Sequence, residues 1–254
     1  MQQLPLRRLA GLVAAILWVG FAASAIAQQP AAAGETPTPA KRTLSKDPPG
    51  MKRLLQGYDA WIDPTHKRVV VDGTVCLRNG QLEMFACPRG TKEHESIVAA
   101  DTQAHAVHAG LLAVGAKAGT PVQFQPTYKP ATGTEIDVEI VWTDKNGTVH
   151  RDRAQDWIKN VKTGKPLEHP WVFAGSGFWE DEETGHKSYL AESGDFICVS
   201  NFPSAMLDLP VESSQANESL LYDAYTDHIP PVGTRVRLVL TPKLKKDATT
   251  GEAR

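Results

Sequence analysis

Cysteine is scarce in this chain, and no two cysteines have the spacing of a common metal motif. The 254 residues include three cysteines, Cys76, Cys87 and Cys198. At most one disulfide can form within the chain, and one thiol is then left over. The sequence also lacks the paired CxxC and HExxH patterns that identify zinc sites most clearly. Any metal site must therefore be built from dispersed ligands.

An excess of basic residues is also absent. Lysine and arginine together number 27 and aspartate and glutamate 29, which gives a formal net charge of -2. Proteins that bind nucleic acid usually concentrate positive charge on one face or along one helix. We therefore expect no nucleic-acid partner.

The amino-terminal residues form the longest apolar run of the sequence. Arg7 and Arg8 precede a run from Leu9 to Ala27 that ends in Ala25-Ile26-Ala27, the small residues that a signal peptidase recognises. Residues 1–27 are therefore predicted to be a cleaved signal peptide of a protein exported to the periplasm or cell envelope, or secreted. An uncleaved anchoring helix is the alternative, since about 20 apolar residues span a membrane. Membrane contact is then expected through this segment alone.

The rest of the chain divides by composition. Residues 28–51 are rich in Ala, Pro, Thr and Lys and lack apolar periodicity, which indicates a disordered linker. Residues 52–242 have the size of a single β-rich domain with its own core, and residues 243–254 form a polar tail.

The pattern of the domain predicts an α+β fold of mostly antiparallel sheet with one main helix. Asn79-Gly80 is a strong hairpin signal, so residues 69–77 and 82–86 are expected to pair with each other. In a regular hairpin Cys76 and Cys87 lie about 13 Å apart along the strands, too far for a disulfide, whereas a bulge or a different turn would allow one. In residues 134–144, apolar side chains alternate with polar ones and indicate a strand with one buried face, followed by a returning strand at 148–153.

Residues 102–117 are expected to form the main helix, with Thr102 or Asp101 as its cap and Gly119 shortly past its end. Its buried face is predicted to contain Val107, Leu111 and Leu112.

The stretch from Gly90 to Gly110, "GTKEHESIVAADTQAHAVHAG", has the greatest concentration of chemically versatile side chains. Histidine, carboxylate and thiol are the groups that bind zinc or a similar divalent metal, and they occur here as His94, Glu95, Asp101, His105 and His108, with Cys87 nearby. On a helix His105 and His108 project from one face, one turn apart. The alternative is that His108, beside Ala104, Leu111 and Leu112, is a half-buried core histidine.

Four segments resemble one known family, the YdjY-type domain of exported bacterial proteins. They are "VCLRNGQLEMFACPRGTKEHESIV", "HAVHAGLLAVGAKAGTPVQF", "WVFAGSGF" and "VRLVLTP", and the resemblance extends from about Val69 to Pro242. It implies a fold and a location, and no established activity. Some relatives carry a separate cysteine segment for an iron–sulfur centre. Three dispersed cysteines do not supply the usual four thiolates, so no iron–sulfur cluster is expected here.

Three functions follow as hypotheses, one of them a purely structural envelope protein. The first is an exported binding or accessory domain for an unknown ligand or envelope partner, with its polar focus at residues 91–108 and Lys92, Glu93, His94 and Glu95 as its binding residues. The second is a metal-dependent enzyme in which His94, His105 and His108 hold a divalent metal such as zinc and Glu95 is the catalytic general base.

Overall fold

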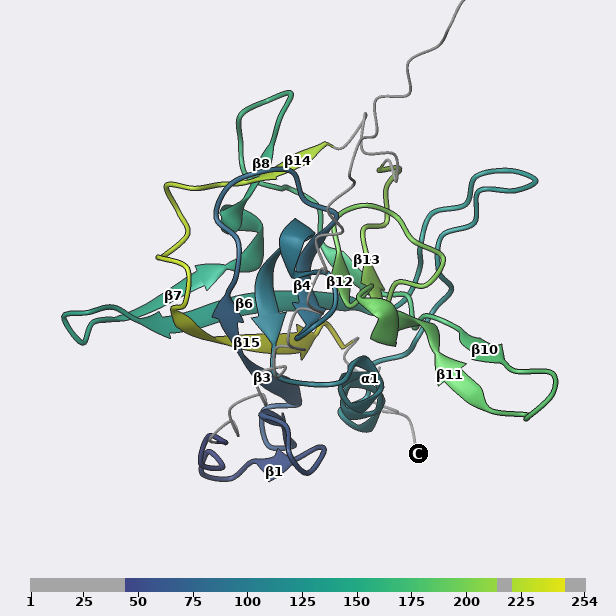
Figure 1. Cartoon of the computed structure of the whole chain (residues 1–254), viewed down its shortest axis with the longest axis horizontal. Coiled ribbons are helices and arrows are strands. Elements are labelled where there is room, and N and C mark those ends of the chain that lie inside the picture. Colours follow the sequence, from purple (N-terminus) through teal and green to yellow (C-terminus); the bar gives the residue numbers. More distant parts are fainter. Residues whose placement is uncertain (1–43, 214–220, 245–254) are drawn as a thin grey trace, which may run out of the picture. The chain divides into compact units, whose positions relative to one another are not determined.

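The computed structural model describes residues 44–213 and 221–244, and its centre is a closed barrel of eight strands (Figure 1). Each strand is bonded to the next and the last is bonded to the first. In order around the barrel they are β3 (Arg68–Val75), β15 (Arg235–Pro242), β6 (Glu135–Thr143), β9 (Trp171–Phe173), β13 (Leu207–Asp208), β12 (Ile197–Cys198), β4 (Met84–Pro88) and β5 (Ser96–Ala100). The pairs β4–β5 and β12–β13 are parallel and the other pairs of the barrel are antiparallel.

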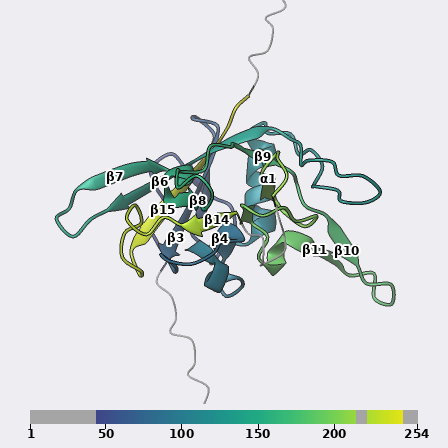
Figure 2. The same ribbon diagram turned by 90° about the horizontal axis from the view of Figure 1, so that it is seen from above.

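Three further strands extend the barrel sheet: β1 (Lys52–Arg53) and β2 (Ala60–Asp63) beside β3, and β7 (Val149–Arg153) beside β6. Two separate two-stranded sheets are formed by β8 (Ile158–Asn160) with β14 (Tyr222–Ala224) and by the hairpin of β10 (Phe178–Glu180) and β11 (Lys187–Tyr189). In both views the β6–β7 and β10–β11 hairpins project from opposite sides of the barrel (Figure 2). Three short 3₁₀ turns connect strands: η1 (Glu93–Glu95), η2 (Ala154–Trp157) and η3 (Leu190–Ser193).

The predicted mostly antiparallel sheet with one main helix is confirmed. The sequence did not predict that this sheet closes into a barrel. Alternation in β6 predicts its buried face correctly, because Ile136, Val138 and Ile140 lie in the core while Asp137 is exposed. In the same way Val69, Val71 and Val75 of β3 face the core. Burial of these β-branched side chains removes apolar surface from water and stabilises the barrel.

The predicted hairpin around Asn79-Gly80 is wrong. β5 lies between β3 and β4, and it pairs with both of them. A type I′ turn needs a positive φ at both central residues, but of these two only Gly80 has one, at 114°. The segment after β3 bonds instead to β14, where the Leu82 amide donates to the Tyr222 carbonyl at 2.9 Å and the Ala224 amide to the Gly80 carbonyl at 2.9 Å. All three cysteines are free thiols.

The main helix, α1 (Ala104–Ala113), is shorter than predicted and packs against β2, β3 and η3. Val107 and Leu111 are buried as expected, but Leu112 is 47% exposed and was wrongly assigned to the buried face. The predicted cap is also wrong. Neither Thr102 nor Asp101 caps the helix, since its N-cap residue is Gln103 and no side-chain cap bond forms from it.

The predicted signal peptide and most of the predicted linker, like most of the polar tail, lie outside the described residues. The end of the linker segment is described and contacts the domain: the Ser45 amide donates to Asp59 Oδ1 at 3.0 Å, and Asp47 accepts from Trp61 Nε1 at 2.7 Å. No helix within residues 44–213 and 221–244 is long and apolar enough to cross a membrane.

Candidate functional site

The stretch with the greatest concentration of polar residues begins as a return loop. Because β4 and β5 are parallel, with Met84 opposite Ser96, residues 89–95 must carry the chain back from the end of one strand to the start of the next. The turn η1 lies in this loop and leads into β5. The predicted binding residues Lys92, Glu93, His94 and Glu95 are therefore all on one short connection.

Lys92 is the centre of a cluster of carboxylates. Its Nζ atom lies 3.1 Å from Asp195 Oδ1, 3.5 Å from Glu83 Oε2 and 3.6 Å from Glu95 Oε1, and 4.6 Å from the centroid of the Phe202 ring. Burial lowers the pKa of Lys92, but the three carboxylates outweigh it and raise the pKa above its ordinary value. This Lys92 cluster ties the return loop to β4 and to the segment after η3.

Glu83 is the most buried of the glutamates in this cluster. Burial raises the pKa of Glu83, and the neighbouring Glu95 carboxylate adds to the effect. The Lys92 ammonium group opposes both effects by lowering the pKa of Glu83, so its positive charge stabilises the neighbouring carboxylates in their ionised form. Since the ammonium group is already surrounded by protein carboxylates, the cluster is best suited to holding the loop.

The other two predicted binding residues lie away from Lys92. Glu93 Oε1 accepts from the Gly90 amide at 2.9 Å and closes its own turn. The His94 side chain is 78% exposed, and its Nε2 atom lies 3.9 Å from Glu95 Oε2. The structure thus brings Lys92 and Glu95 together with Glu83 and Asp195, which the sequence pattern did not indicate.

The three histidines predicted as metal ligands have separate partners. His105 Nδ1 lies 2.7 Å from Glu192 Oε1, and His108 Nδ1 lies 2.8 Å from the Tyr189 hydroxyl, whereas His94 is on the return loop. Among the residues that the structure describes, no group of three or more His, Cys, Asp or Glu side chains is arranged to hold a metal ion. A site formed by these histidines stays a prediction that this geometry does not support.

His108 has the surroundings of a core histidine. Its ring is 4.8 Å from the Phe173 ring and 5.4 Å from the Tyr189 ring, edge-on to both. Burial lowers the pKa of His108 below its ordinary value, which favours the neutral imidazole. Such a ring supplies packing and one polar contact between α1 and β11.

A cavity of about 860 Å³ opens beside the start of α1. Small-molecule sites usually enclose about 300 to 1,000 Å³ and have a few polar groups at fixed positions. Two stretches of chain and one isolated residue line this cavity: Pro88, Arg89, Thr91, Thr102, Gln103 and His105 from the first, Phe178, His186, Lys187, Ser188, Tyr189 and Glu192 from the second, and Tyr58. We call this space the α1 cavity.

Glu192, on η3, forms one wall of the α1 cavity and also begins the helix. Its Oε2 atom accepts from the Ala104 amide at 3.1 Å, and its Oε1 atom accepts from the His105 amide at 2.8 Å. These amides are among the four at a helix start that have no partner inside the helix. The negative charge also lies where the helix dipole favours it. The carboxylate therefore replaces the cap that Thr102 was expected to provide.

Arg89, which also lines the cavity, is held by a buried acid. Its Nε atom lies 2.6 Å from Asp101 Oδ1, and its Nη2 atom donates to Thr74 Oγ1 at 3.0 Å. Asp101 is 1% exposed and also binds Arg235 Nη1 at 2.5 Å. A buried carboxylate that fixes a guanidinium in this way orients it before any ligand arrives.

Asp101 belongs to a ring of three buried aspartates. The Asp59 amide donates to the Asp101 carbonyl at 2.9 Å, the Asp72 amide to the Asp59 carbonyl at 2.8 Å, and the Asp101 amide to the Asp72 carbonyl at 2.8 Å. Arg235 Nη2 lies 3.8 Å from Asp59 Oδ2 and 3.9 Å from Asp72 Oδ2, so one guanidinium contacts all three acids. Arg53 Nη1 adds a contact of 2.9 Å to Asp59 Oδ1. We call these groups the aspartate ring.

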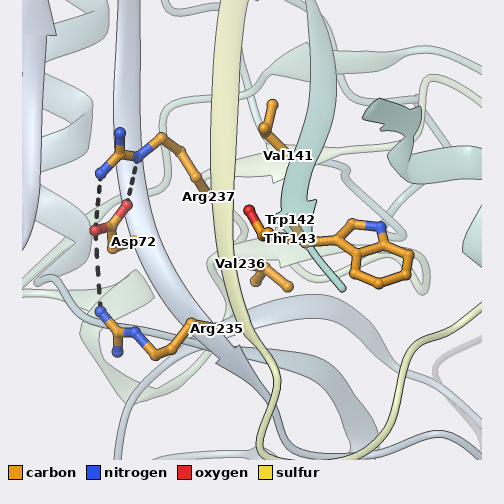
Figure 3. Close-up of a pocket in the computed structure, with 7 residues that line it drawn as sticks. All are labelled: Asp72, Val141, Trp142, Thr143, Arg235, Val236 and Arg237. Atoms are coloured by element: carbon orange, nitrogen blue, oxygen red, sulfur yellow. Dashed lines mark hydrogen bonds and ion pairs between the residues drawn. The ribbon is translucent and has the colours of Figure 1, made fainter. Parts of the chain in front are cut away.

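Figure 3 shows one aspartate of the ring, Asp72, between Arg235 and Arg237. Arg237 binds this carboxylate through two nitrogens, Nε at 2.6 Å and Nη2 at 3.0 Å. A second cavity of about 300 Å³ adjoins them and is lined on its other side by Val141, Trp142, Thr143 and Val236. Because both guanidinium groups point to Asp72 and away from Trp142, this space has few free polar groups.

Sequence reasoning missed much of the α1 cavity. Thr91, Thr102, Gln103 and His105 fall in the stretch from 90 to 110, but Arg89 precedes it and was not selected. Phe178, Tyr189 and Glu192 are more than seventy residues further along the chain. The usable signal was weak: an aromatic pair, Phe178-Trp179, in a strand of only three residues.

The chain was compared with known proteins. The model of the YdjY domain family matches residues 60–241, which is most of the chain and nearly all of the described structure. No curated protein matches the chain, and no solved structure does. The family match agrees with the resemblance seen in the sequence and includes every strand of the barrel except the last residue of β15. The chain belongs to the YdjY domain family.

Proposed function

We propose that this chain is an exported binding domain and that it takes a small molecule in the α1 cavity. One observation carries the proposal. A cavity of about 860 Å³ lies where residues 88–105, with their many polar side chains, meet the β10–β11 hairpin and η3. Its size suits a small organic ligand, and its walls combine apolar surface with fixed polar groups.

Rigid support favours binding over a purely structural role. Glu192 and Arg89 both line the cavity, and each is fixed by hydrogen bonds to the domain. Walls that are ordered before the ligand arrives reduce the entropy lost on binding.

Export is proposed from the sequence alone. The run from Leu9 to Ala27, behind Arg7 and Arg8, has the composition of a signal peptide. We expect the exported protein to begin at Gln28, which amino-terminal sequencing of the protein from the periplasmic fraction would check. An intact amino terminus in the membrane fraction would contradict cleavage and support the anchoring alternative.

Ligand binding can be tested by a thermal-shift screen of the full chain against small metabolites, with two matched variants. Ser188→Trp places an indole in the α1 cavity, and Glu182→Trp places one at the exposed tip of the same hairpin. Compounds that raise the melting temperature of the unmodified chain should lose their effect in Ser188→Trp and keep it in Glu182→Trp. A screen without any stabilising compound, or hits that survive Ser188→Trp, would overturn the proposal.

A further inference from the structure

The charged side chains that line the α1 cavity are two cations and one carboxylate. Arg89 and Lys187 can only donate hydrogen bonds, and Gln103, His186 and Tyr58 can donate as well as accept. Among the described residues that line the cavity, Glu192 is the one carboxylate.

That carboxylate is already committed to α1. It accepts from the Ala104 and His105 amides and contacts His105 Nδ1 at 2.7 Å. Little of its acceptor capacity is therefore left for a ligand, and a cation gains little from it. The cavity as a whole offers a ligand donors and positive charge.

Arg89 is the best placed of these donors. Two of its nitrogens, Nε and Nη2, are held by Asp101 and Thr74, while its Nη1 atom has no partner among residues 44–213 and 221–244. The side chain is 42% exposed, whereas Asp101 is buried behind it. A guanidinium that is anchored on one edge and open at another is suited to bind an anionic oxygen.

The same cavity has an aromatic surface. Phe178 is 67% exposed, and its ring is 5.3 Å from that of Tyr189, which also lines the cavity. The Phe178 ring is therefore accessible to a ligand that enters the cavity. Offset or edge contacts with a ligand ring would remove Phe178 from water and stabilise the complex.

We propose that the ligand of the α1 cavity is a small aromatic carboxylate, with its acid group at Arg89 and its ring against Phe178. This inference rests on the proposed function, because it assigns the ligand class of the same cavity. Lys187 also lines the cavity, but its ammonium group is paired with Glu180 at 3.2 Å, so Arg89 is the main cation that the cavity offers to a ligand.

Isothermal titration calorimetry of the full chain tests the class with matched pairs: benzoate, phenylacetate and cinnamate, each against its neutral amide. We expect at least one carboxylate to bind, and its amide to bind at least about tenfold more weakly, since an anionic partner strengthens each hydrogen bond to arginine. Two results would overturn the class: an amide that binds as tightly as its carboxylate, or no carboxylate binding at all. If the aromatic carboxylates fail but metabolites from the thermal-shift screen bind in the cavity, only the ligand class is refuted and the proposed binding function stands. If no metabolite binds either, both the ligand class and the proposed function are refuted.

Two pairs of variants locate the contacts. Arg89→Gln should weaken carboxylate binding about tenfold or more. Its control, Arg68→Gln, also removes an arginine bound to a buried aspartate. The control should leave binding unchanged, because Arg68 pairs with Asp63 away from the cavity. Phe178→Ala should weaken binding several-fold. Its control, Trp179→Ala, removes the next residue, which is 53% exposed but does not line the cavity. Equal effects within either pair would overturn the placement of the ligand.

Discussion

Glu192 caps α1 from a distance of 88 residues, and this contact yields the sharpest stability prediction. Replacing Glu192 with Ala removes the acceptors of the Ala104 and His105 amides, at 3.1 and 2.8 Å, and the partner of the His105 ring, at 2.7 Å. The N-cap residue Gln103 makes no side-chain bond that could compensate. The first turn of the helix should therefore fray.

The size of the loss follows from its parts. Loss of a helix cap costs about 1 kcal/mol, and loss of a negative charge at the helix start costs about 0.5 kcal/mol more. The pair with His105 is half exposed, so solvent screening leaves it only a few tenths of a kcal/mol. We expect Glu192→Ala to lower the free energy of unfolding by about 1 to 3 kcal/mol and the melting temperature by roughly 3 to 9 °C.

Urea unfolding measures this loss. Glu182→Ala is the control, because it removes an exposed glutamate at the hairpin tip. Glu192→Gln should fall between the two, since its amide keeps one carbonyl oxygen as an acceptor but loses the charge. If Glu192→Ala stays within about 0.5 kcal/mol of the unmodified chain, the normal range of surface substitutions, the capping role is refuted. Native-state hydrogen exchange of the Ala104 and His105 amides should accelerate in the same variant.

Three further predictions concern other buried groups. Burial raises the pKa of Asp208 from an ordinary value of 3.8 to about 7. Between these two pH values the folded state therefore binds more protons than the unfolded state. As the pH rises from the lower to the higher value, the free energy of unfolding should fall by up to about 4 kcal/mol. Asp208→Asn should lose this fall in urea titrations at several pH values, and an unchanged pH profile would contradict the assignment. An Ellman assay without reductant should find three reactive thiols in urea. The thiols should react only slowly in the native state, because Cys87 and Cys198 are buried and burial raises the pKa of half-buried Cys76 to about 12. Fewer than three thiols in urea would indicate a disulfide. Gly194→Ala should destabilise by about 1 to 3 kcal/mol, because φ is +133° there and a Cβ would lie 2.5 Å from Lys92 Cγ, and an unchanged urea midpoint would show that Lys92 moves freely.

Sequence periodicity predicted which face of a strand is buried, and it did so because a strand alternates by geometry. Ile136, Val138 and Ile140 of β6 and Val69, Val71 and Val75 of β3 all face the core as their spacing indicated. The same property says nothing about partners. A strand with a buried face can close a barrel, lie in an open sheet or form a hairpin, and the apolar pattern is the same in each case.

The wrong hairpin illustrates this limit. Asn79-Gly80 is a local signal, but β5 offers β3 and β4 a better arrangement, because it bonds to both and closes the barrel between them. The loop polar groups find partners in β14, which lies more than 130 residues further along the chain. Long-range strand pairing of this kind overrides a local turn preference of a few kcal/mol at most. The residues that pair are too far apart in the sequence for a short segment to reveal the pairing.

The candidate site shows the same division between local and distant information. The sequence located a minor part of the α1 cavity, since Thr91, Thr102, Gln103 and His105 lie in the polar stretch that it singled out. It missed the rest because residues such as Phe178 and Glu192 reach the cavity only through the fold.

The misplaced helix cap has a physical cause that connects the two parts of the cavity. Asp101 is a good capping residue by type, but Arg89 and Arg235 bind its carboxylate at 2.6 and 2.5 Å. Those contacts commit the Asp101 side chain to orienting Arg89, so the first amides of α1 need another acceptor, and Glu192 supplies it from η3. As a result the cavity is lined by a guanidinium with an open edge and by a carboxylate whose oxygens already accept hydrogen bonds. A local rule for helix starts fails here because the aspartate that would satisfy it is used to build the cavity.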